Sequence, residues 1–326
     1  MALAALALIA ALVASPDLLA PYAKPGQLIV LADGRALNLV CMGQGAPAVV
    51  LEAGWSSWSL DWAPVQARLA ETTRVCAYDR AGLGFSSADP RPKTLDTVVA
   101  DLTEMLDKAG VVGPLVLVGG SKGAVFARAF AAAHPDRITG LVLIDPGSPE
   151  RDEAFLTLDA AGESKARAEI DAALKRCVDR AKAEIFTIEG PQDAFCADDG
   201  EAGWSPALKT AYRALQRSVA YAETRRAEIA IDNTLPANVR GPGVLGDRPL
   251  IVLKADDPLS KAIPEPRRSE LDRIEKAVAA NLAQMSRRGQ LRTVSNSGHM
   301  VAQDRPDAVI EAVEAVVAEV RQKTRP

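Results

Sequence analysis

One serine in this chain lies in a setting that favours nucleophilic chemistry. Ser121 is the central residue of Gly-Gly-Ser-Lys-Gly at 119–123, which follows the apolar run 115–118 and opens an alanine-rich stretch. A G-x-S-x-G turn between a strand and a helix lifts the serine above the sheet edge and points helix amides at charge that forms there. Glycine at 119 and 123 avoids Cβ atoms that would crowd the turn. The alternative is a glycine-rich turn that only packs a helix against a strand.

A serine hydroxyl needs a base, and only two histidines can supply an imidazole. His134 follows Ser121 by about 13 residues on the expected helix, which places it roughly 20 Å away at 1.5 Å per residue. It also precedes Pro135, at the far end of that helix. His299 lies in Ser-Gly-His-Met at 297–300, after the last expected strand, and the order serine first, histidine last fits a fold built around this elbow. We therefore predict His299 as the base.

Lys122 follows the serine, so its backbone amide is the expected first donor to an oxyanion, and the second comes from the loop after Leu51. The Lys122 side chain could favour an anionic substrate or form a salt bridge with another part of the chain. The interpretation that we favour is a solvated lysine at the start of a helix.

The segments around these residues alternate between short apolar runs and helical patterns. Continuous apolar strands separated by helices predict an α/β protein, with a mostly parallel sheet flanked by helices on both faces. The expected strands are 28–31, 36–40, 48–51, 74–78, 115–118, 140–144, 249–254 and 291–294, and the expected helices are 64–71, 95–109, 122–133, 270–286 and 307–320.

The character of the chain changes after Pro149. Residues 150–240 are rich in Ala, Glu, Lys and Arg and contain no convincing strand. We interpret residues 149–240 as a helical cap inserted into one sheet domain, formed by residues 26–148 and 241–326, with an apolar N-terminal segment at 1–25.

The composition excludes some classes of protein. The formal net charge is -4 and the charged residues are scattered, so the chain lacks a basic footprint for nucleic acid. With two histidines and no CxxC or HExxH motif, we predict no metal site and no cofactor. The expected partner is a small-molecule acyl substrate, and the oligomeric state is not determined.

Residues 2–14 are apolar and uncharged and end in Ala-Ser-Pro. The run is short for a membrane span and has the length of a signal-peptide core, although it lacks the usual positive start. We expect export to the periplasm or the medium, or N-terminal membrane anchoring. A buried N-terminal helix and a cytoplasmic location stay open.

The four cysteines bear on the same question. Cys41 and Cys76 lie in or beside expected strands, where we predict buried thiols. Cys177 and Cys196 flank a polar, helix-rich stretch and would form a disulfide if the protein is exported, although no pairing follows from sequence alone.

Together these segments resemble the α/β-hydrolase superfamily from about residue 26 to residue 322. Leu-Glu-Ala-Gly-Trp at 51–55 stands where such enzymes usually carry His-Gly-x. The other similar segments are Tyr-Asp-Arg-Ala-Gly-Leu-Gly-Phe-Ser at 78–86, His-Pro through Asp-Pro at 134–146, Ser-Gly-His at 297–299 and Asp-Arg-Pro at 304–306.

This resemblance implies further site residues. It implies that Trp55 supplies the second oxyanion amide, with Gly54 giving the backbone room. The triad carboxylate would be Asp257, after the penultimate strand where most of the superfamily places it, or Asp145, where a minority does. Lys254 replaces the glycine usual before the former position, and relatives with the Leu-Glu-Ala-Gly pattern often lack an aspartate there. We favour Asp145 slightly and keep both.

The predicted reaction is acyl transfer from a carboxylic ester or related substrate to water through an acyl-enzyme. A serine at 121 argues against dehalogenase or epoxide hydrolase chemistry, which uses an aspartate nucleophile in this superfamily. One alternative is a proline-type aminopeptidase, in which Glu163 or Glu169 would bind the substrate amine. Another is a non-catalytic binding protein on the same fold.

Overall fold

The apolar runs of the sequence form one eight-stranded sheet in the computed structural model, which describes residues 16–185, 195–257, 259 and 263–324. The strand order is β1-β2-β4-β3-β5-β6-β7-β8; β1 and β2 run antiparallel to their neighbours, and the other pairs are parallel. The strands are β1 (Gln27–Val30), β2 (Ala36–Met42), β3 (Ala48–Glu52), β4 (Val75–Tyr78), β5 (Leu115–Gly120), β6 (Ile138–Ile144), β7 (Leu250–Ala255) and β8 (Gly289–Val294).

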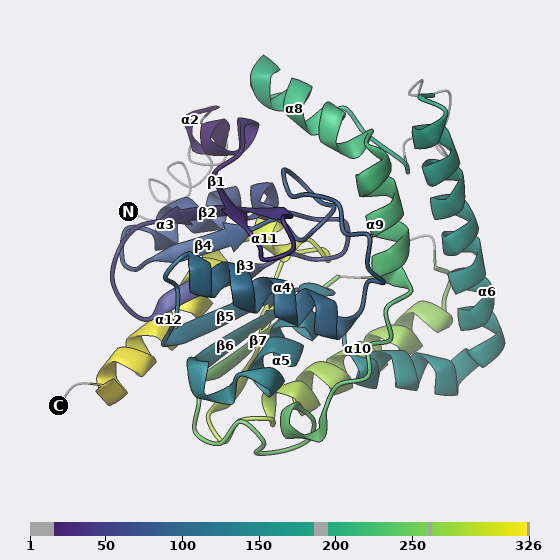
Figure 1. Cartoon of the computed structure of the whole chain (residues 1–326). Coiled ribbons are helices and arrows are strands. Elements are labelled where there is room, and N and C mark those ends of the chain that lie inside the picture. The colour runs from purple at the N-terminus through teal and green to yellow at the C-terminus, as the bar shows by residue number, and fades with distance from the viewer. Residues whose placement is uncertain (1–15, 186–194, 258, 260–262, 325–326) are drawn as a thin grey trace.

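Helices cover both faces of this sheet (Figure 1). One face packs against α3 (Ala63–Leu69) and α12 (Pro306–Thr324), and the other against α4 (Leu95–Lys108), α5 (Gly123–Ala133) and α10 (Arg267–Ala283). Central strands are buried on both sides, which explains why they read as unbroken apolar runs rather than as alternating patterns. The predicted fold class, a mostly parallel sheet flanked by helices, is confirmed.

Local signals fix where several of these elements begin. Asp33 and Gly34 form the turn between β1 and β2, and Gly34 adopts a φ of 86° that favours glycine. Thr94 caps α4 by accepting a hydrogen bond from the Thr97 amide at 3.1 Å, while the Thr97 hydroxyl accepts one from the Thr94 amide.

The described part of the chain between β6 and β7 is mainly helical. Helices α6 (Pro149–Lys182) and α9 (Val219–Ile229) lie side by side. Helix α8 (Pro206–Gln216), which precedes α9 in the chain, extends away from it toward the N-terminal elements (Figure 1). Each begins at a serine whose hydroxyl accepts a hydrogen bond from an amide in the first turn; these serines are Ser148, Ser205 and Ser218. The shorter helices are α2 (Pro16–Leu19), η1 (Ala20–Ala23), η2 (Ser59–Trp62), η3 (Pro135–Arg137), η4 (Ala237–Val239) and α11 (Val301–Asp304).

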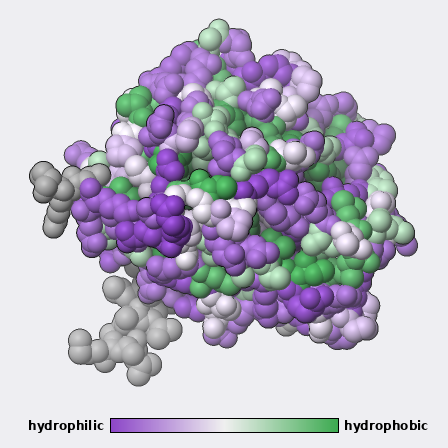
Figure 2. Space-filling model, turned by 90° about the horizontal axis from the view of Figure 1, so that it is seen from below, coloured by the Kyte–Doolittle hydropathy of each residue, from purple (hydrophilic) through white to green (hydrophobic). Residues whose placement is uncertain are grey.

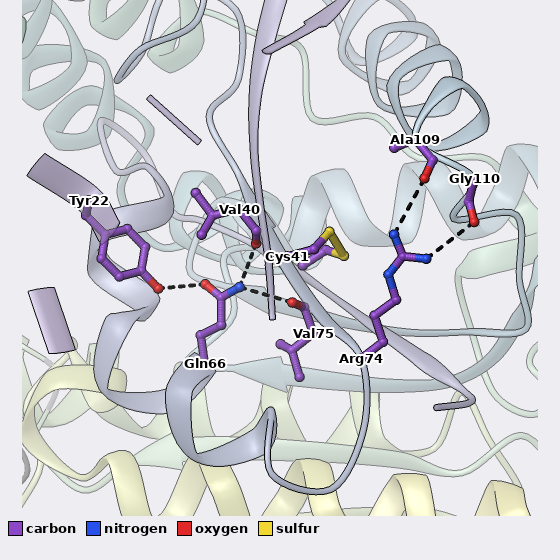
Figure 3. The surroundings of a disulfide bond; sticks show 9 residues. Tyr22, Val40, Cys41, Gln66, Arg74, Val75, Ala109 and Gly110 are labelled. Atoms are coloured by element: carbon purple, nitrogen blue, oxygen red, sulfur yellow. Dashed lines mark hydrogen bonds between the residues drawn. A yellow bond between two sulfur atoms is a disulfide. The ribbon is translucent and has the colours of Figure 1, made fainter. Parts of the chain in front are cut away.

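All four cysteines form disulfides. Cys177 in α6 joins Cys196 in the segment before α8, and Cys41 joins Cys76. The prediction of buried thiols at 41 and 76 is wrong, because the two cysteines are joined in a disulfide (Figure 3). They are direct partners in the antiparallel register of β2 and β4. Register depends on pairing between strands far apart in the chain, so the individual strand patterns did not reveal the contact.

The surface is mixed in character. Hydrophobic and hydrophilic residues alternate in small areas over the face shown in Figure 2. Within the described ranges, none of the helices has both the length and the apolar character needed to cross a membrane. The apolar run at 2–14, on which the export prediction depends, lies outside the described residues.

One fully buried side chain ties α3 to the sheet beside the Cys41–Cys76 disulfide (Figure 3). The Gln66 amide nitrogen donates to the carbonyls of Val40 at 2.6 Å and Val75 at 3.0 Å, and its oxygen accepts from the Tyr22 hydroxyl at 2.7 Å. An apolar replacement would therefore leave buried polar groups unpaired.

We expect Gln66→Leu to lower the free energy of unfolding by about 2 kcal/mol, and Tyr22→Phe, which removes a single hydroxyl, by about 1 kcal/mol. Urea unfolding followed by circular dichroism would measure both. A Gln66→Leu variant as stable as the wild type would contradict this account of the α3 contact.

Candidate active site

The turn between β5 and α5 holds Ser121 in a conformation that few side chains adopt. Its φ is 50°, in the left-handed region, and its amide donates to the carbonyl of Ile144 at 2.9 Å. A Cβ added at Gly119 would lie 2.6 Å from the Gly123 carbonyl oxygen, and one at Gly123 would lie 2.3 Å from the Glu52 carbonyl oxygen. Both flanking glycines are thus required by close backbone contacts, and the turn presents the serine at the end of the strand.

Ser121, His299 and Asp145 form one hydrogen-bonded chain. The Ser121 Oγ lies 2.8 Å from His299 Nε2, and His299 Nδ1 lies 2.5 Å from Asp145 Oδ2. The three come from the elbow, the loop after β8 and the end of β6. The imidazole is partly exposed and the carboxylate is buried. This order of hydroxyl, imidazole and carboxylate is the geometry that nucleophilic serine chemistry requires.

Asp145 is held as an anion in spite of its burial. Burial alone would raise its pKa, but the hydrogen bond from His299 and the charge of Lys254 lower the pKa below its ordinary value. Lys254 Nζ lies 2.5 Å from Asp145 Oδ1 and 2.6 Å from Glu275 Oε2, and all three side chains are buried. The lysine that departs from the superfamily pattern therefore makes an ion pair with the carboxylate facing the histidine.

The other candidate carboxylate lies outside the hydrogen-bonded series of Ser121, His299 and Asp145. Asp257 is partly exposed, and its side chain pairs with Arg268 rather than with the imidazole. Its neighbour Asp256 accepts hydrogen bonds from the amides of Asn296 and Ser297 and so orders the loop that carries His299. Of the two predicted acids, the structure brings Asp145 to the histidine and leaves Asp257 outside; the role of Asp256 was not foreseen.

The two residues predicted from the loop after β3 also lie at the elbow. A Cβ built on Gly54 would be 3.4 Å from the Ser121 Cβ, so the backbone passes close to the serine. Trp55 follows, and its indole nitrogen donates to the Arg225 carbonyl at 2.8 Å. The Lys122 amide lies at the start of α5, where helix amides lack partners in a preceding turn. The Gly54 backbone and the start of α5 thus both lie next to Ser121.

The Lys122 side chain is buried, which contradicts the prediction of a solvated lysine. Its ammonium donates to the Asn233 side chain, and burial lowers its pKa to about 8. The sequence did not reveal this contact because Asn233 follows α9, more than a hundred residues along the chain.

Arg80 holds the loop that follows β3 and lies beside Ser121. This role was not predicted from the sequence. Its guanidinium donates to the carbonyls of Ala53 and Gly54, each at 2.7 Å, and pairs with Glu52 at 2.8 Å and with Glu228 of α9 at 2.7 Å. Burial raises the pKa of Glu52 to about 6, although the Arg80 charge opposes the rise. The arginine in the 78–86 motif was the only available signal.

Two cavities meet at Ser121 and His299. The larger has a volume of about 200 Å³ and the smaller about 90 Å³. The larger is lined by Ala53, Gly54, Trp55, Ser57, Asp61, Trp62, Gly120, Ser121, Ile144, His299, Met300, Val301, Ala302 and Gln303. The smaller is lined by Ser121, Asp145, Pro146, Gly147, Arg151, Lys254, Glu275, Val278, Ala279 and His299. No cluster of potential metal ligands occurs among the residues that the structure describes.

Comparison with known families gives the same fold. A family model described as the alpha/beta hydrolase family matches residues 43–312, which is most of the chain. The chain belongs to the alpha/beta hydrolase family. This membership and the fold support hydrolase activity, without specifying the bond that is cleaved.

Curated relatives of this chain match over parts of their length. A protein named as a carbamate hydrolase, from Azorhizobium caulinodans, is 32% identical over 125 residues, covering 38% of this chain and 44% of that protein. An uncharacterized protein of Schizosaccharomyces pombe is 32% identical over 153 residues, covering 38% of this chain and 29% of the relative. The chain thus spans less than half the length of these relatives.

Solved structures match over about nine tenths of the chain. An esterase from Thermogutta terrifontis superposes with a TM-score of 0.60 at 20% identity, covering 90% of this chain and 99% of the esterase. An enol-lactonase from Burkholderia xenovorans gives a TM-score of 0.57 at 21% identity, covering 90% and 100%. At these identities the likeness establishes the fold alone.

The ion pair between Lys254 and Asp145 leads to a prediction about how the reactivity of Ser121 depends on pH. Lys254→Met removes a positive charge that lowers the pKa of Asp145, so the carboxylate takes up a proton more readily and Ser121 should lose reactivity at a higher pH than in the wild type. Glu275→Gln leaves Lys254 free to pair with Asp145 alone, so the shift should be in the opposite direction. We expect each shift to be about 0.5 to 1 pH unit.

The rate of Ser121 labelling by a fluorophosphonate, measured from pH 5 to pH 9, would test this without knowledge of the substrate. Loss of reactivity with an unmoved pH profile in both variants would mean that the lysine only supports the local fold.

Proposed function

We propose that this chain is a serine hydrolase that cleaves a carboxylic ester, or a related acyl substrate, through an acyl-enzyme intermediate. The observation that carries the proposal is the series of hydrogen bonds from Ser121 through His299 to Asp145. Ser121 Oγ lies 2.8 Å from His299 Nε2, and His299 Nδ1 lies 2.5 Å from Asp145 Oδ2. Asp145 is the triad carboxylate in this proposal, and Asp257 is not part of the triad.

In the proposed reaction, Ser121 Oγ attacks the substrate carbonyl carbon while His299 Nε2 takes the hydroxyl proton. The carbonyl oxygen gains negative charge and accepts hydrogen bonds from the Lys122 and Trp55 amides. The carbon–oxygen bond then breaks, and the imidazolium returns its proton to the departing alcohol. Water repeats the sequence on the acyl-serine, with His299 as base, and releases the acid. Asp145 keeps the imidazole in the tautomer that can accept a proton at Nε2.

The names of the similar proteins support acyl chemistry of this class. They include an esterase, an enol-lactonase and a carbamate hydrolase, all of which act on carbonyl compounds. Epoxide hydrolases also occur among the similar structures. The serine at 121 favours the acyl reaction over that second chemistry.

The geometry gives less support to the alternative of a proline-type aminopeptidase. In that alternative, a carboxylate from the segment between β6 and β7 would bind the substrate amine. Glu163 lies 3.3 Å from Arg267, and Glu169 is mostly exposed. Neither side chain lines the two cavities at Ser121.

We also propose that the chain is exported or anchored outside the cytoplasm. Both disulfides favour an oxidising compartment, and the apolar run at 2–14 has the length of a signal-peptide core.

Hydrolysis of p-nitrophenyl esters from acetate to palmitate tests the proposal. We expect Ser121→Ala to reduce kcat by at least about a thousandfold and Asp145→Asn by about a thousandfold or more, because each breaks the triad. Asp257→Asn should stay within about threefold of the wild type, since its carboxylate pairs with Arg268.

Circular dichroism would establish that the variants are folded. A wild-type rate unaffected by Ser121→Ala, or a loss caused by Asp257→Asn and not by Asp145→Asn, would refute the assignment.

A further inference from the structure

We propose that Asp61 makes the larger cavity a subsite for an organic cation, so that the preferred substrate carries a protonated amine or a quaternary ammonium group close to the ester carbonyl. This inference rests on the proposed function, because it concerns the group that accompanies the cleaved bond.

The position of Asp61 comes from the loop that follows β3. Asp61 lies in η2, whose Ser59 amide donates to the buried Asp79 at 2.9 Å, and its carbonyl accepts from the Gln303 side chain at 3.3 Å. Both Asp61 and Gln303 line the cavity that also contains Ser121 and His299. A substrate group in this cavity is therefore adjacent to a carbonyl bound at the serine.

The charge of Asp61 sets it apart from the other acids near the site. Glu52 and Glu228 pair with Arg80, and Asp145 pairs with Lys254. Within the part of the chain that the structure describes, no lysine, arginine or histidine nitrogen lies within 4 Å of the Asp61 carboxylate.

The surroundings of the Asp61 carboxyl group also disfavour its ionised form. Burial raises the pKa of Asp61 to about 6. A hydrogen bond from the Ser57 side chain opposes the rise, and the negative charges of Asp79, Asp198 and Glu201 add to it. At neutral pH the group is still ionised, so a cationic ligand would supply the opposite charge that the protein does not place there.

The remaining walls suit an alkylammonium group rather than a hydrated ion. Trp55 and Trp62 line the cavity together with Ile144, Met300, Val301 and Ala302. Aromatic faces attract cations, and the apolar side chains accommodate the methyl or methylene groups around the nitrogen. A substrate carboxylate in the same place would face Asp61 and be repelled.

One cation does lie near the aromatic wall. The Arg225 guanidinium stacks 5.2 Å from the Trp55 ring, donates to Ser56 Oγ and to the Phe195 carbonyl, and does not line the cavity. Its donors are directed to these partners, and it makes no ion pair with Asp61 within 4 Å. The inside of the cavity thus keeps an acidic character.

Pairs of esters that differ only in charge test the proposal. The first pair places the group on the alcohol side: choline butyrate against 3,3-dimethylbutyl butyrate. The second places it on the acyl side: the p-nitrophenyl esters of 4-(trimethylammonio)butyrate and 5,5-dimethylhexanoate. In at least one pair, we expect the wild type to prefer the cation by about tenfold or more in kcat/KM.

Asp61→Asn should reduce that preference, measured as the ratio of kcat/KM within each pair, to within about twofold. Asp247→Asn is the matched control, because it removes an exposed carboxylate that pairs with Arg287. Equal rates within both pairs for the wild type, or a preference that persists in Asp61→Asn, would overturn the inference and leave the hydrolase proposal standing.

A binding measurement separates the two proposals if no ester is hydrolysed. Saturation-transfer NMR with butyltrimethylammonium should show binding to the wild type and weaker binding, by about tenfold, to Asp61→Asn. Binding with no hydrolysis of any ester would support the subsite and refute the ester reaction. Equal binding to both proteins, or to neither, would refute the subsite.

Discussion

The architecture around Ser121 depends on one fully buried guanidinium. A buried arginine cannot lose its proton, so each of its donors must find an acceptor, or the fold bears the cost of an uncompensated charge. Arg80 meets this requirement with the carboxylates of Glu52 and Glu228 and the carbonyls of Ala53 and Gly54. These acceptors lie on the end of β3, the loop beside the serine and helix α9. The ion pairs and hydrogen bonds of Arg80 therefore hold the loop after β3 beside the Ser121 turn. They also hold helix α9, which belongs to the segment between β6 and β7, against that loop.

The fold and the serine–histidine pair were predictable because their signals are local. Buried strands read as apolar runs, and the elbow compresses strand, turn and helix into a few consecutive residues. The low number of histidines made His299 the remaining choice once His134 was placed along the α5 helix. None of these inferences needed knowledge of which strands pair.

The parts that sequence reasoning left open all depend on tertiary contacts. Asp145 and Asp257 follow neighbouring parallel strands, so both come near the histidine loop, and a pattern cannot tell which side chain turns toward the ring. The Cys41–Cys76 disulfide required the β2–β4 register, and the burial of Lys122 required Asn233 from beyond α9. Arg80 was visible only as one letter of a loop motif, since its partners lie on two other segments, residues 52–54 and Glu228 of α9.

The insertion leaves the sheet at the end of β6 and returns at β7, and these two strands are hydrogen-bonded neighbours, with Ile144 opposite Leu253. The ends of β6 and β7 therefore form a fixed pair of attachment points. The pairing of these two strands does not depend on the length or shape of the segment attached between them. A related insertion could be grafted there to change substrate preference while the catalytic framework is kept. The graft would have to retain Asp145 and Lys254 at the junctions and supply an acid in place of Glu228. Otherwise the buried arginine would have no counter-charge from the transplanted part.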